Sequence, residues 1–144
     1  VYFFSLDAAS APAVWAARNL WGLPYFNAQM KMEESDDVVT YDSQRRRDDA
    51  VHHVRYRVGE TVDSSDSSSL EFFFLERYLL FVERRKRMYV GQVYHTPYPA
   101  HLADVIECND SMLKAAGLAG EWGQPPFMHY SPGVDVEVFA LNEA

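Results

Sequence analysis

The stretch that decides the fold runs from Arg18 to Met32 and reads RNLWGLPYFNAQMKM. A helical pattern ends at Gly22, the residue type that most often follows the last turn of a helix, and Pro24 prevents the helix from continuing. Beyond the proline the period of the pattern changes to two, so that apolar and polar side chains alternate. The sequence therefore predicts a helix that is joined by a tight turn to a strand with one apolar and one polar face.

The residues on either side of the turn support this interpretation. Residues 8–21 contain no glycine, and apolar side chains recur there at helical spacing. Ser10 is placed to act as the N-cap, and Pro12 is tolerated in the first turn. On the strand predicted at 25–34, the apolar face holds Phe26, Ala28, Met30 and Met32, and the polar face holds Tyr25, Asn27, Gln29, Lys31 and Glu33.

Composition indicates one compact domain that spans residues 1–144. The chain has 144 residues, of which 48% are hydrophobic and 15% aromatic, enough to bury a core. It does not begin with methionine, and it opens inside an apolar run, Val1–Leu6. We therefore expect it to be the C-terminal portion of a longer barrel domain.

The charge of the chain limits its partners. A net charge of −8 disfavours nucleic acid, because binding to phosphates needs clustered lysine and arginine. The two basic clusters, at 45–47 and 84–87, are interpreted as a charged strand end and a hairpin tip, with an anion site as the alternative. The single cysteine, Cys108, cannot form an internal disulfide and is interpreted as a structural thiol, so a cytoplasmic location is expected. No apolar run reaches the length that spans a membrane, so no membrane association is expected.

The rest of the chain predicts strands, with two further short helices. The helices are expected at 70–78 and 110–116, and loops at 61–69 and 121–126. The strands are expected at 1–6, 38–47, 50–58, 78–84, 88–95, 102–108, 127–130 and 134–141, with the last two forming a hairpin around the Ser-Pro-Gly sequence at 131–133. This pattern predicts an α+β, mainly β fold, in which a few helices pack on a curved antiparallel sheet or a cone-like barrel.

The turn resembles the one in acetoacetate decarboxylase and its relatives. Their turn reads roughly Arg-Glu-x-x-Gly-x-Pro-Lys-Lys, and a lysine after the proline forms a Schiff base with the ketone substrate. Here Arg18, Asn19, Gly22 and Pro24 occupy the matching positions, but Tyr25 and Phe26 stand at the two lysine positions. Because that chemistry needs the amine, the resemblance implies the frame of the enzyme without its decarboxylase activity.

A wider resemblance covers nearly the whole chain. The segments at 1–8, 21–30, 69–78 and 129–138, taken together, resemble the YqjF-like family of unknown function, which is assigned to the acetoacetate decarboxylase-like superfamily. The resemblance implies a cone-like antiparallel barrel with an interior cavity, and self-association into a homo-oligomer. It implies no established activity.

Two charged positions are the strongest candidates for chemistry. Lys31 would become a nucleophile if its face lined a cavity, where burial lowers the pKa of an amine, and otherwise it is an ordinary charge at a strand edge. Glu76 and Arg77 lie between apolar residues, where an unpaired charge is rare. Arg77 could receive a substrate carboxylate through two hydrogen bonds, or it could form a structural ion pair at the junction between helix and strand.

The histidines do not predict a metal site. His52 and His53 are adjacent in a strand and so point to opposite faces, and no metal-binding spacing occurs elsewhere. His95 and His129 could act as acids or bases, or could be structural groups held by hydrogen bonds. We therefore expect neither a metal nor a cofactor.

These observations leave three hypotheses for function. The first is a barrel that binds a small apolar or carboxylate ligand, and its candidate ligand-binding residues are Tyr25, Asn27, Gln29, Arg77, His95 and Tyr130. The second is an enzyme on a small keto or carboxylic acid, in which the catalytic residue is Lys31 or a residue of the expected N-terminal segment. The third is a structural module for dimerisation.

Overall fold

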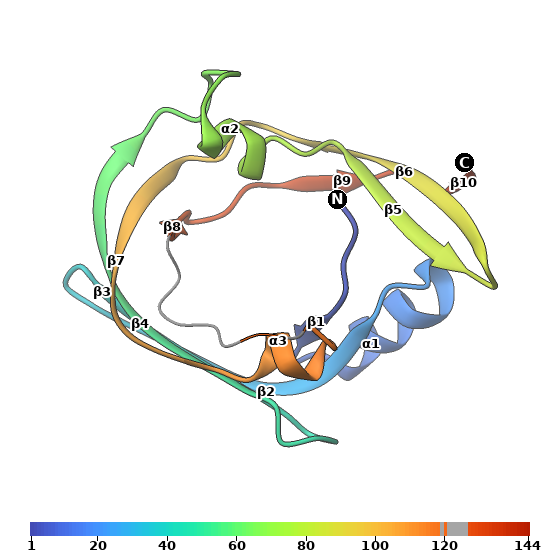
Figure 1. Ribbon diagram of the computed structural model, residues 1–144, viewed down its shortest axis with the longest axis horizontal. Coiled ribbons are helices and arrows are strands. Elements are labelled where there is room, and N and C mark those ends of the chain that lie inside the picture. Colours follow the sequence, from blue (N-terminus) through green and yellow to red (C-terminus); the bar gives the residue numbers. More distant parts are fainter. Residues whose placement is uncertain (119, 121–126) are drawn as a thin grey trace. The chain divides into compact units, whose positions relative to one another are not determined.

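The computed structural model describes residues 1–118, 120 and 127–144, which form two compact units. Unit 1 comprises Val1–Phe3, Glu60–Leu102 and His129–Ala144, and unit 2 comprises Phe4–Gly59 and Ala103–Met128. Each unit is mainly β with few helices, which confirms the predicted class (Figure 1). The loop expected at 121–126 lies outside the described residues.

Unit 2 contains a sheet and two helical segments. In sheet order its strands are β1 (Leu6–Ala8), β2 (Tyr25–Ser35), β3 (Val38–Arg45), β4 (Val51–Val62) and β7 (Ala100–Asp110). The last residues of β4 and the first residues of β7 belong to unit 1. The helices of unit 2 are α1 (Ala11–Ala16), the π-helix η1 (Ala17–Trp21) and α3 (Met112–Ala115). β1 pairs with β2 in parallel, whereas β2, β3 and β4 pair antiparallel. Figure 1 shows α1 beside β2.

The helix, the turn and the strand form where the sequence predicts them. The Ser10 hydroxyl accepts a hydrogen bond from the Ala13 amide at 3.4 Å and caps α1. Gly22 ends the helical segment with φ of 73°, a left-handed conformation that suits glycine. The helix begins at Ala11 rather than at residue 8 because residues 6–8 form β1, where the Leu6 amide bonds to the Pro24 carbonyl. The strand expected at 1–6 is therefore wrong for most of its length: the range contains an isolated bridge at Tyr2 and the first residue of β1, Leu6.

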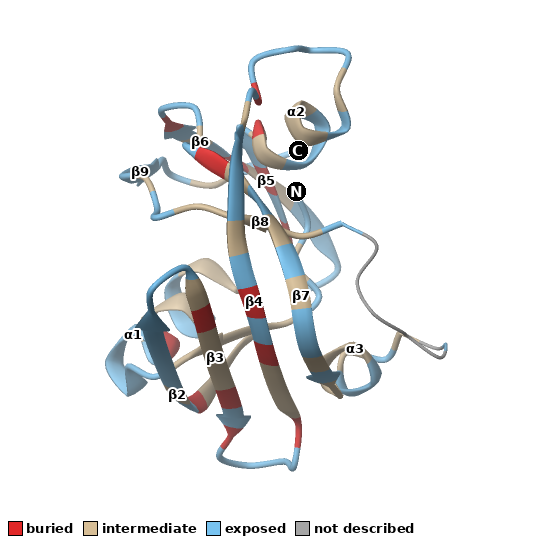
Figure 2. Ribbon diagram, turned by 90° about the vertical axis from the view of Figure 1, so that its left-hand side faces the viewer, coloured by how far each residue is buried: buried red, intermediate tan, exposed pale blue. Residues whose placement is uncertain are grey.

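The buried side of unit 2 lies mainly on β3 and β4, as the red segments of Figure 2 show. Val39, Val54 and Tyr56 are buried there, and Ala28 of β2 is fully buried. The same side of β3 also buries Ser43 and Arg45, so polar groups interrupt the apolar pattern. That mixture explains why the sequence of this strand shows no clean apolar face.

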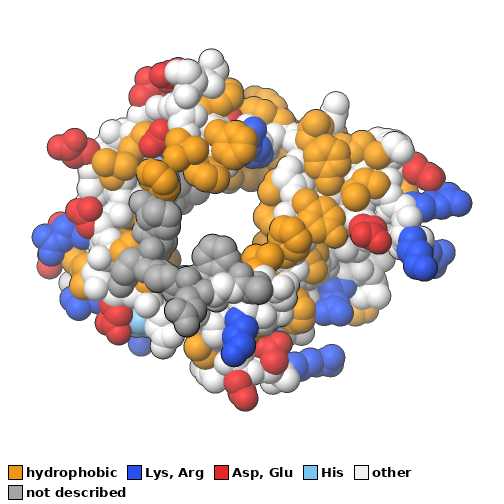
Figure 3. Space-filling view, viewed as in Figure 1, with side chains coloured by type: hydrophobic (Ala, Val, Ile, Leu, Met, Phe, Trp, Pro, Cys, Tyr) orange, Lys and Arg blue, Asp and Glu red, His pale blue; other side chains and the backbone are white. Residues whose placement is uncertain are grey.

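Unit 1 contains a second, smaller sheet. Unit 1 holds the helix α2 (Leu70–Leu75) and the strands β5 (Leu79–Arg84), β6 (Arg87–His95), β8 (His129–Tyr130), β9 (Val136–Val138) and β10 (Asn142–Glu143). Of these strands, β8 pairs with β7 and is not part of the smaller sheet. β6 lies between β5 and β10 and also pairs with β9. The Ser69 hydroxyl caps α2 by accepting from the Phe72 amide at 3.0 Å, which confirms the predicted short helix. The basic tip between β5 and β6 lies at the right-hand edge of Figure 3, where lysine and arginine side chains gather.

The C-terminal strands pair differently from the prediction. The hairpin expected between 127–130 and 134–141 does not form, because β8 pairs with β7 and β9 pairs with β6. Each short segment forms its backbone hydrogen bonds with a longer strand. Elsewhere the differences are small: β4 continues to Val62, into the expected loop, and α3 is shorter than predicted.

Among the described residues, no helix combines the length and the apolar character needed to cross a membrane.

Candidate functional site

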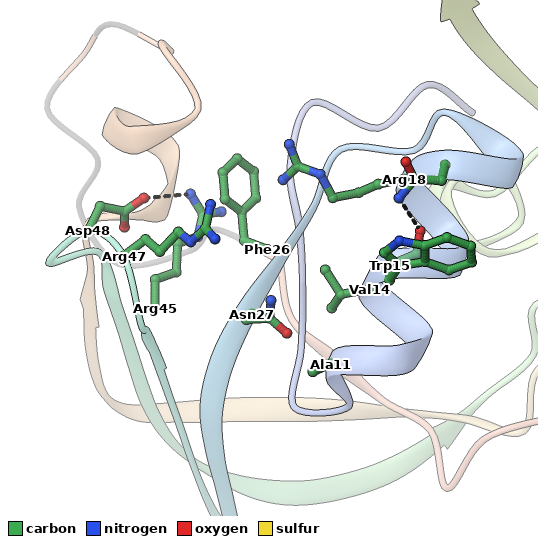
Figure 4. A pocket seen from close by; sticks show the side chains of 10 residues that line it. Ala11, Val14, Trp15, Arg18, Phe26, Asn27, Arg45, Arg47 and Asp48 are labelled. Carbon is green, nitrogen blue, oxygen red and sulfur yellow. Dashed lines mark hydrogen bonds and ion pairs between the residues drawn. The ribbon is translucent and has the colours of Figure 1, made fainter.

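A pocket of about 370 Å³ opens in unit 2 beside the turn that decides the fold (Figure 4). Its walls come from α1, η1, the start of β2, the end of β3 and the segment that follows β3. The residues that line it are Ala11, Val14, Trp15, Arg18, Asn19, Phe26, Asn27, Arg45, Arg47 and Asp48. Small apolar and aromatic surfaces thus stand beside three guanidinium groups and one carboxylate.

Arg45 is the most deeply buried charged group of the pocket, with 3% of its side chain exposed. Its Nε donates to Oδ1 of Asp7 at 2.8 Å, and its Nη2 donates to the Ser5 hydroxyl. The Ser43 hydroxyl donates to the second oxygen of Asp7 at 3.2 Å. Because both the cation and the anion have partners, the pair can remain buried without an unpaired charge. Arg45 therefore serves as a fixed wall of the pocket.

Phe26, two residues after Pro24, has two arginines close to its ring. The guanidinium carbon of Arg45 lies 3.9 Å from the centre of its ring, and that of Arg18 lies 5.7 Å from it. Arg18 is held in place because its Nη1 donates to the Tyr25 carbonyl at 2.9 Å. Cations over an aromatic face are attracted to its electron density, so the ring and the two arginines fix one another.

The charges of the pocket do not cancel. Arg45 has two carboxylate neighbours, Asp7 and, at 3.8 Å, Asp48. Arg18 and Arg47 form no ion pair with a carboxylate within residues 1–118, 120 and 127–144. Two uncompensated positive charges therefore face one pocket in a chain with a net charge of −8.

The helical wall of the pocket has an unusual backbone. Arg18 and Asn19 belong to the π-helix η1, a rare form that is often found at functional sites. The side-chain amide of Asn19 donates to the Trp15 carbonyl at 2.8 Å and so ties η1 to α1. Arg18 and Asn19 both line the pocket from η1.

Of the four candidates on β2, the pocket includes Asn27. The side-chain oxygen of Asn27 is buried and has no hydrogen-bond partner within the described part of the chain. Tyr25 contributes its carbonyl to Arg18, and Gln29 is exposed. Lys31 is exposed and pairs with Glu33 at 2.6 Å; the hydrogen bond to Glu33 and its charge raise the pKa of the amine. An amine whose pKa is raised stays protonated at neutral pH and is a poor nucleophile. Lys31 also lacks the burial that the enzyme hypothesis requires.

The other three candidates lie in unit 1, among aromatic rings. His95 is buried; it stacks on Tyr78 with ring centres 4.7 Å apart, and its Nδ1 lies 2.8 Å from the Thr96 carbonyl. The Arg77 guanidinium lies 4.0 Å from the centre of the Phe73 ring. The ring of Tyr130 lies 6.2 Å from that of His101. The seven predicted site residues are thus distributed over two units, and the pocket of unit 2 contains one of them.

The expected ion pair at Glu76 and Arg77 is replaced by two separate contacts. Glu76 is 6% exposed and accepts a hydrogen bond from the Tyr78 hydroxyl through one oxygen. Its other oxygen, and Nη2 of Arg77, are buried without a partner among the residues that the structure describes. Tyr78 keeps its proton more firmly, because the hydrogen bond to Glu76 raises its pKa.

The paired histidines and the cysteine are held in environments that do not favour catalysis. Within the described ranges, no group of three or more histidine, cysteine or acidic side chains is arranged to hold a metal ion. His52 lies 2.9 Å from Asp110 and His53 lies 2.6 Å from Asp42, so each has its own carboxylate. Burial, and then the charge of Asp110, raise the pKa of Cys108, which disfavours the reactive thiolate.

Several residues that line the pocket were not among the predicted site residues, including Trp15, Arg18, Arg45 and Arg47. Residues 45–47 were predicted to form a charged strand end, with an anion site as the alternative; the hairpin between β2 and β3 pairs Ala28 with Arg45. That register follows from a turn at residues 36–37, and it places the arginines beside Phe26 and Asn27. Pairing the residues of the two strands outward from this turn would have predicted that register, and with it the position of the pocket.

Fold and site together define a mainly β protein with an arginine-lined pocket beside a helix–turn–strand element. The chain belongs to the DUF2071 family, described as an uncharacterized conserved protein, which matches residues 1–135. It is 33% identical over 144 residues to the uncharacterized protein YqjF of Bacillus subtilis (strain 168), covering 99% of this chain and 59% of YqjF. The chain therefore spans less than two thirds of the length of this curated relative. No solved structure matches the chain.

Proposed function

We propose that the chain is part of a small-molecule-binding protein, and that the pocket of unit 2 holds a ligand without forming a covalent bond to it. The observation that carries this proposal is the pocket itself, because it combines apolar walls with a few fixed polar groups, as ligand sites do. If the resemblance to the decarboxylases holds, Tyr25 and Phe26 occupy the positions at which Schiff-base chemistry would need an amine. The ligand would be a small apolar or carboxylate molecule.

The proposal extends to the fold of the complete domain. The helix–turn–strand element and the antiparallel hairpins of unit 2 support an acetoacetate decarboxylase-like barrel, to which residues beyond this chain would contribute. In that setting the pocket would lie beside the position of the catalytic lysines. The cavity would thus be kept while the covalent chemistry is lost.

The test is a titration of isotope-labelled full-length protein with small neutral and anionic aromatic compounds, followed by NMR. We expect the amide signals that shift to cluster at residues 11–27 and 45–48. The variant Ala11→Trp fills the pocket and should abolish these shifts. Ala13→Trp is the matched control, because Ala13 is exposed on the same helix and does not line the pocket.

A panel that shifts no pocket signal, or that shifts equal numbers of signals in both variants, would contradict the proposal. Treatment with pyruvate or acetoacetate and borohydride tests the enzyme alternative in the same sample. An adduct that is lost in Lys31→Met would favour catalysis by that amine.

Self-association is a second candidate role, and exposed apolar side chains of unit 1 favour it. Phe73, Phe74, Tyr94 and Phe139 are each about half exposed or more, and such surfaces often mark interfaces. Sedimentation of the full-length protein at micromolar concentration tests this role. A monomer would count against it, and a dimer that dissociates in Phe73→Ser would support it.

A further inference from the structure

We infer that the ligand of this pocket is a carboxylate attached to a compact apolar body, and that Arg18 and Arg47 bind its charged end. The inference rests on the proposed binding function and specifies its ligand. It depends on the charges that remain unpaired in the pocket, on the apolar walls, and on the way in which Arg45 is held.

The unpaired charges indicate a negative ligand. Asp7 and Asp48 face Arg45, which leaves Arg18 and Arg47 without a carboxylate partner in the described residues. Arg18 uses Nη1 to hold the Tyr25 carbonyl, so its Nε and Nη2 remain to donate to a ligand. A guanidinium group presents paired donors that match the two oxygens of a carboxylate.

The apolar walls indicate that the anion carries a body that avoids water. Ala11, Val14 and Trp15 line one side of the pocket, and Trp15 is 61% exposed although its ring is large and apolar. In Figure 4 the ring of Phe26 stands between Arg18 and the other two arginines, so apolar surface lies next to both cationic groups. A ligand that is only a small ion would leave these walls exposed to water.

Arg45 acts as a positioning residue rather than as a ligand-binding residue. Its Nε and Nη2 donate to Asp7 and Ser5, and its Nη1 lies near Asp48. Its guanidinium carbon lies 3.9 Å from the centre of the Phe26 ring, and this contact orients the ring. Arg47 follows two residues later in the chain. The buried network thereby fixes the wall from which Arg47 extends.

The test compares three probes that separate charge from body: benzoate, benzamide and acetate, each titrated into the full-length protein by calorimetry or NMR. Benzamide has the shape of benzoate without its charge, and acetate has the charge without the ring. We expect benzoate to bind about tenfold more tightly than either, the ratio that one charged hydrogen-bonded contact supplies. Arg18→Gln and Arg47→Gln should each weaken benzoate about tenfold and leave benzamide unchanged.

Arg46→Gln is the control, because Arg46 is an exposed arginine next to both Arg45 and Arg47 and does not line the pocket. It should leave all three affinities unchanged. If benzamide binds as tightly as benzoate, the carboxylate inference fails while the proposed binding function stands. If acetate binds as tightly as benzoate, the apolar body is wrong. If Arg46→Gln weakens benzoate binding as much as Arg47→Gln does, the effect is one of general surface charge, and the assignment of Arg47 to the carboxylate is overturned. If no probe binds the pocket, the proposed binding function itself fails.

Discussion

The two units bury charged side chains in different ways. In unit 2 Arg45 is buried with Asp7, and hydroxyl groups of Ser5 and Ser43 complete the network. In unit 1 Glu76 is buried with one hydrogen bond from Tyr78 and one oxygen without a partner in the described residues. A satisfied pair supports the structure around it, whereas a half-satisfied carboxylate adds a desolvation cost that its surroundings must offset. The difference predicts a large loss of stability when the negative charge is removed in unit 2, and only a small change when it is removed in unit 1.

The largest effect is expected at Asp7. Asp7→Asn keeps the shape of the side chain but leaves Arg45 buried without a full negative partner, so the free energy of unfolding of unit 2 should fall by about 3 kcal/mol. Hydrogen exchange of the β2 and β3 amides measures it, because these strands open with the unit. Asp49→Asn is the control, since Asp49 is an exposed acid close in sequence to the buried end of β3. A loss of stability that is the same in both variants would show that the Arg45 network does not hold unit 2 together.

An intermediate effect is expected from removing the Tyr78 hydroxyl. Tyr78→Phe takes away the hydrogen bond that Glu76 accepts and leaves a buried carboxylate without it, which should cost unit 1 about 2 kcal/mol. Hydrogen exchange of the β5 and β6 amides reports on this unit. Tyr94→Phe is the control, because Tyr94 is a more exposed tyrosine of the same unit and does not contact Glu76. If Tyr78→Phe and Tyr94→Phe lowered the stability of unit 1 by the same small amount, the hydrogen bond from Tyr78 to Glu76 would contribute nothing to stability.

A smaller effect is expected when Glu76 itself is changed. Glu76→Gln removes the charge, keeps an oxygen that can accept from Tyr78, and should alter the stability of unit 1 by no more than about 1 kcal/mol. This small change contrasts with the strong destabilisation of unit 2 that is expected from Asp7→Asn. When Glu76→Gln and Tyr78→Phe are combined, removal of the hydroxyl should cost less than it does beside the carboxylate. A loss of several kcal/mol in Glu76→Gln would mean that the charge of Glu76 has a partner that stabilises it.

The sequence predicted the local elements of unit 2 better than the contacts between them. The helix, the Gly22 stop and the strand after Pro24 follow from residues within a few positions of one another, and all three are confirmed. The DUF2071 match confirms the family, and the mainly β class follows from the alternating patterns. The decarboxylase-like barrel stays a prediction.

The pocket was harder to predict because it depends on register. Asn27 was identified from its place on β2, but Arg47 joins it only because the hairpin brings the end of β3 back to the start of β2. The burial of Arg45 depends in addition on Asp7, which is 38 positions away in the chain. The pairing of β8 and β9 was predicted wrongly for the same reason, since the competing partners, β7 and β6, are distant in sequence.

The smallest effect concerns a histidine that is paired at the surface of unit 2. His53 lies 2.6 Å from Asp42 and 3.8 Å from Glu107, and the hydrogen bond to Asp42 is the main reason that its pKa is raised above 6.5. A raised pKa in the folded state means that protonation stabilises unit 2. That contribution is complete below pH 6.5, where the unfolded chain is also protonated, and it is lost as the pH rises through the pKa of the folded state.

An NMR titration of the His53 ring tests this expectation directly. The midpoint should lie above 6.5 in the unchanged protein and should move down in Asp42→Asn, which removes the nearer carboxylate. Glu34→Gln is the control, because Glu34 is an exposed acid on β2 that does not contact His53. Compared with His53→Gln, the unchanged protein should gain stability at about pH 5.5 relative to about pH 8. An unmoved midpoint in Asp42→Asn would show that this ion pair is too exposed to act, and that, of these interactions, the buried network around Arg45 alone stabilises unit 2 through charge.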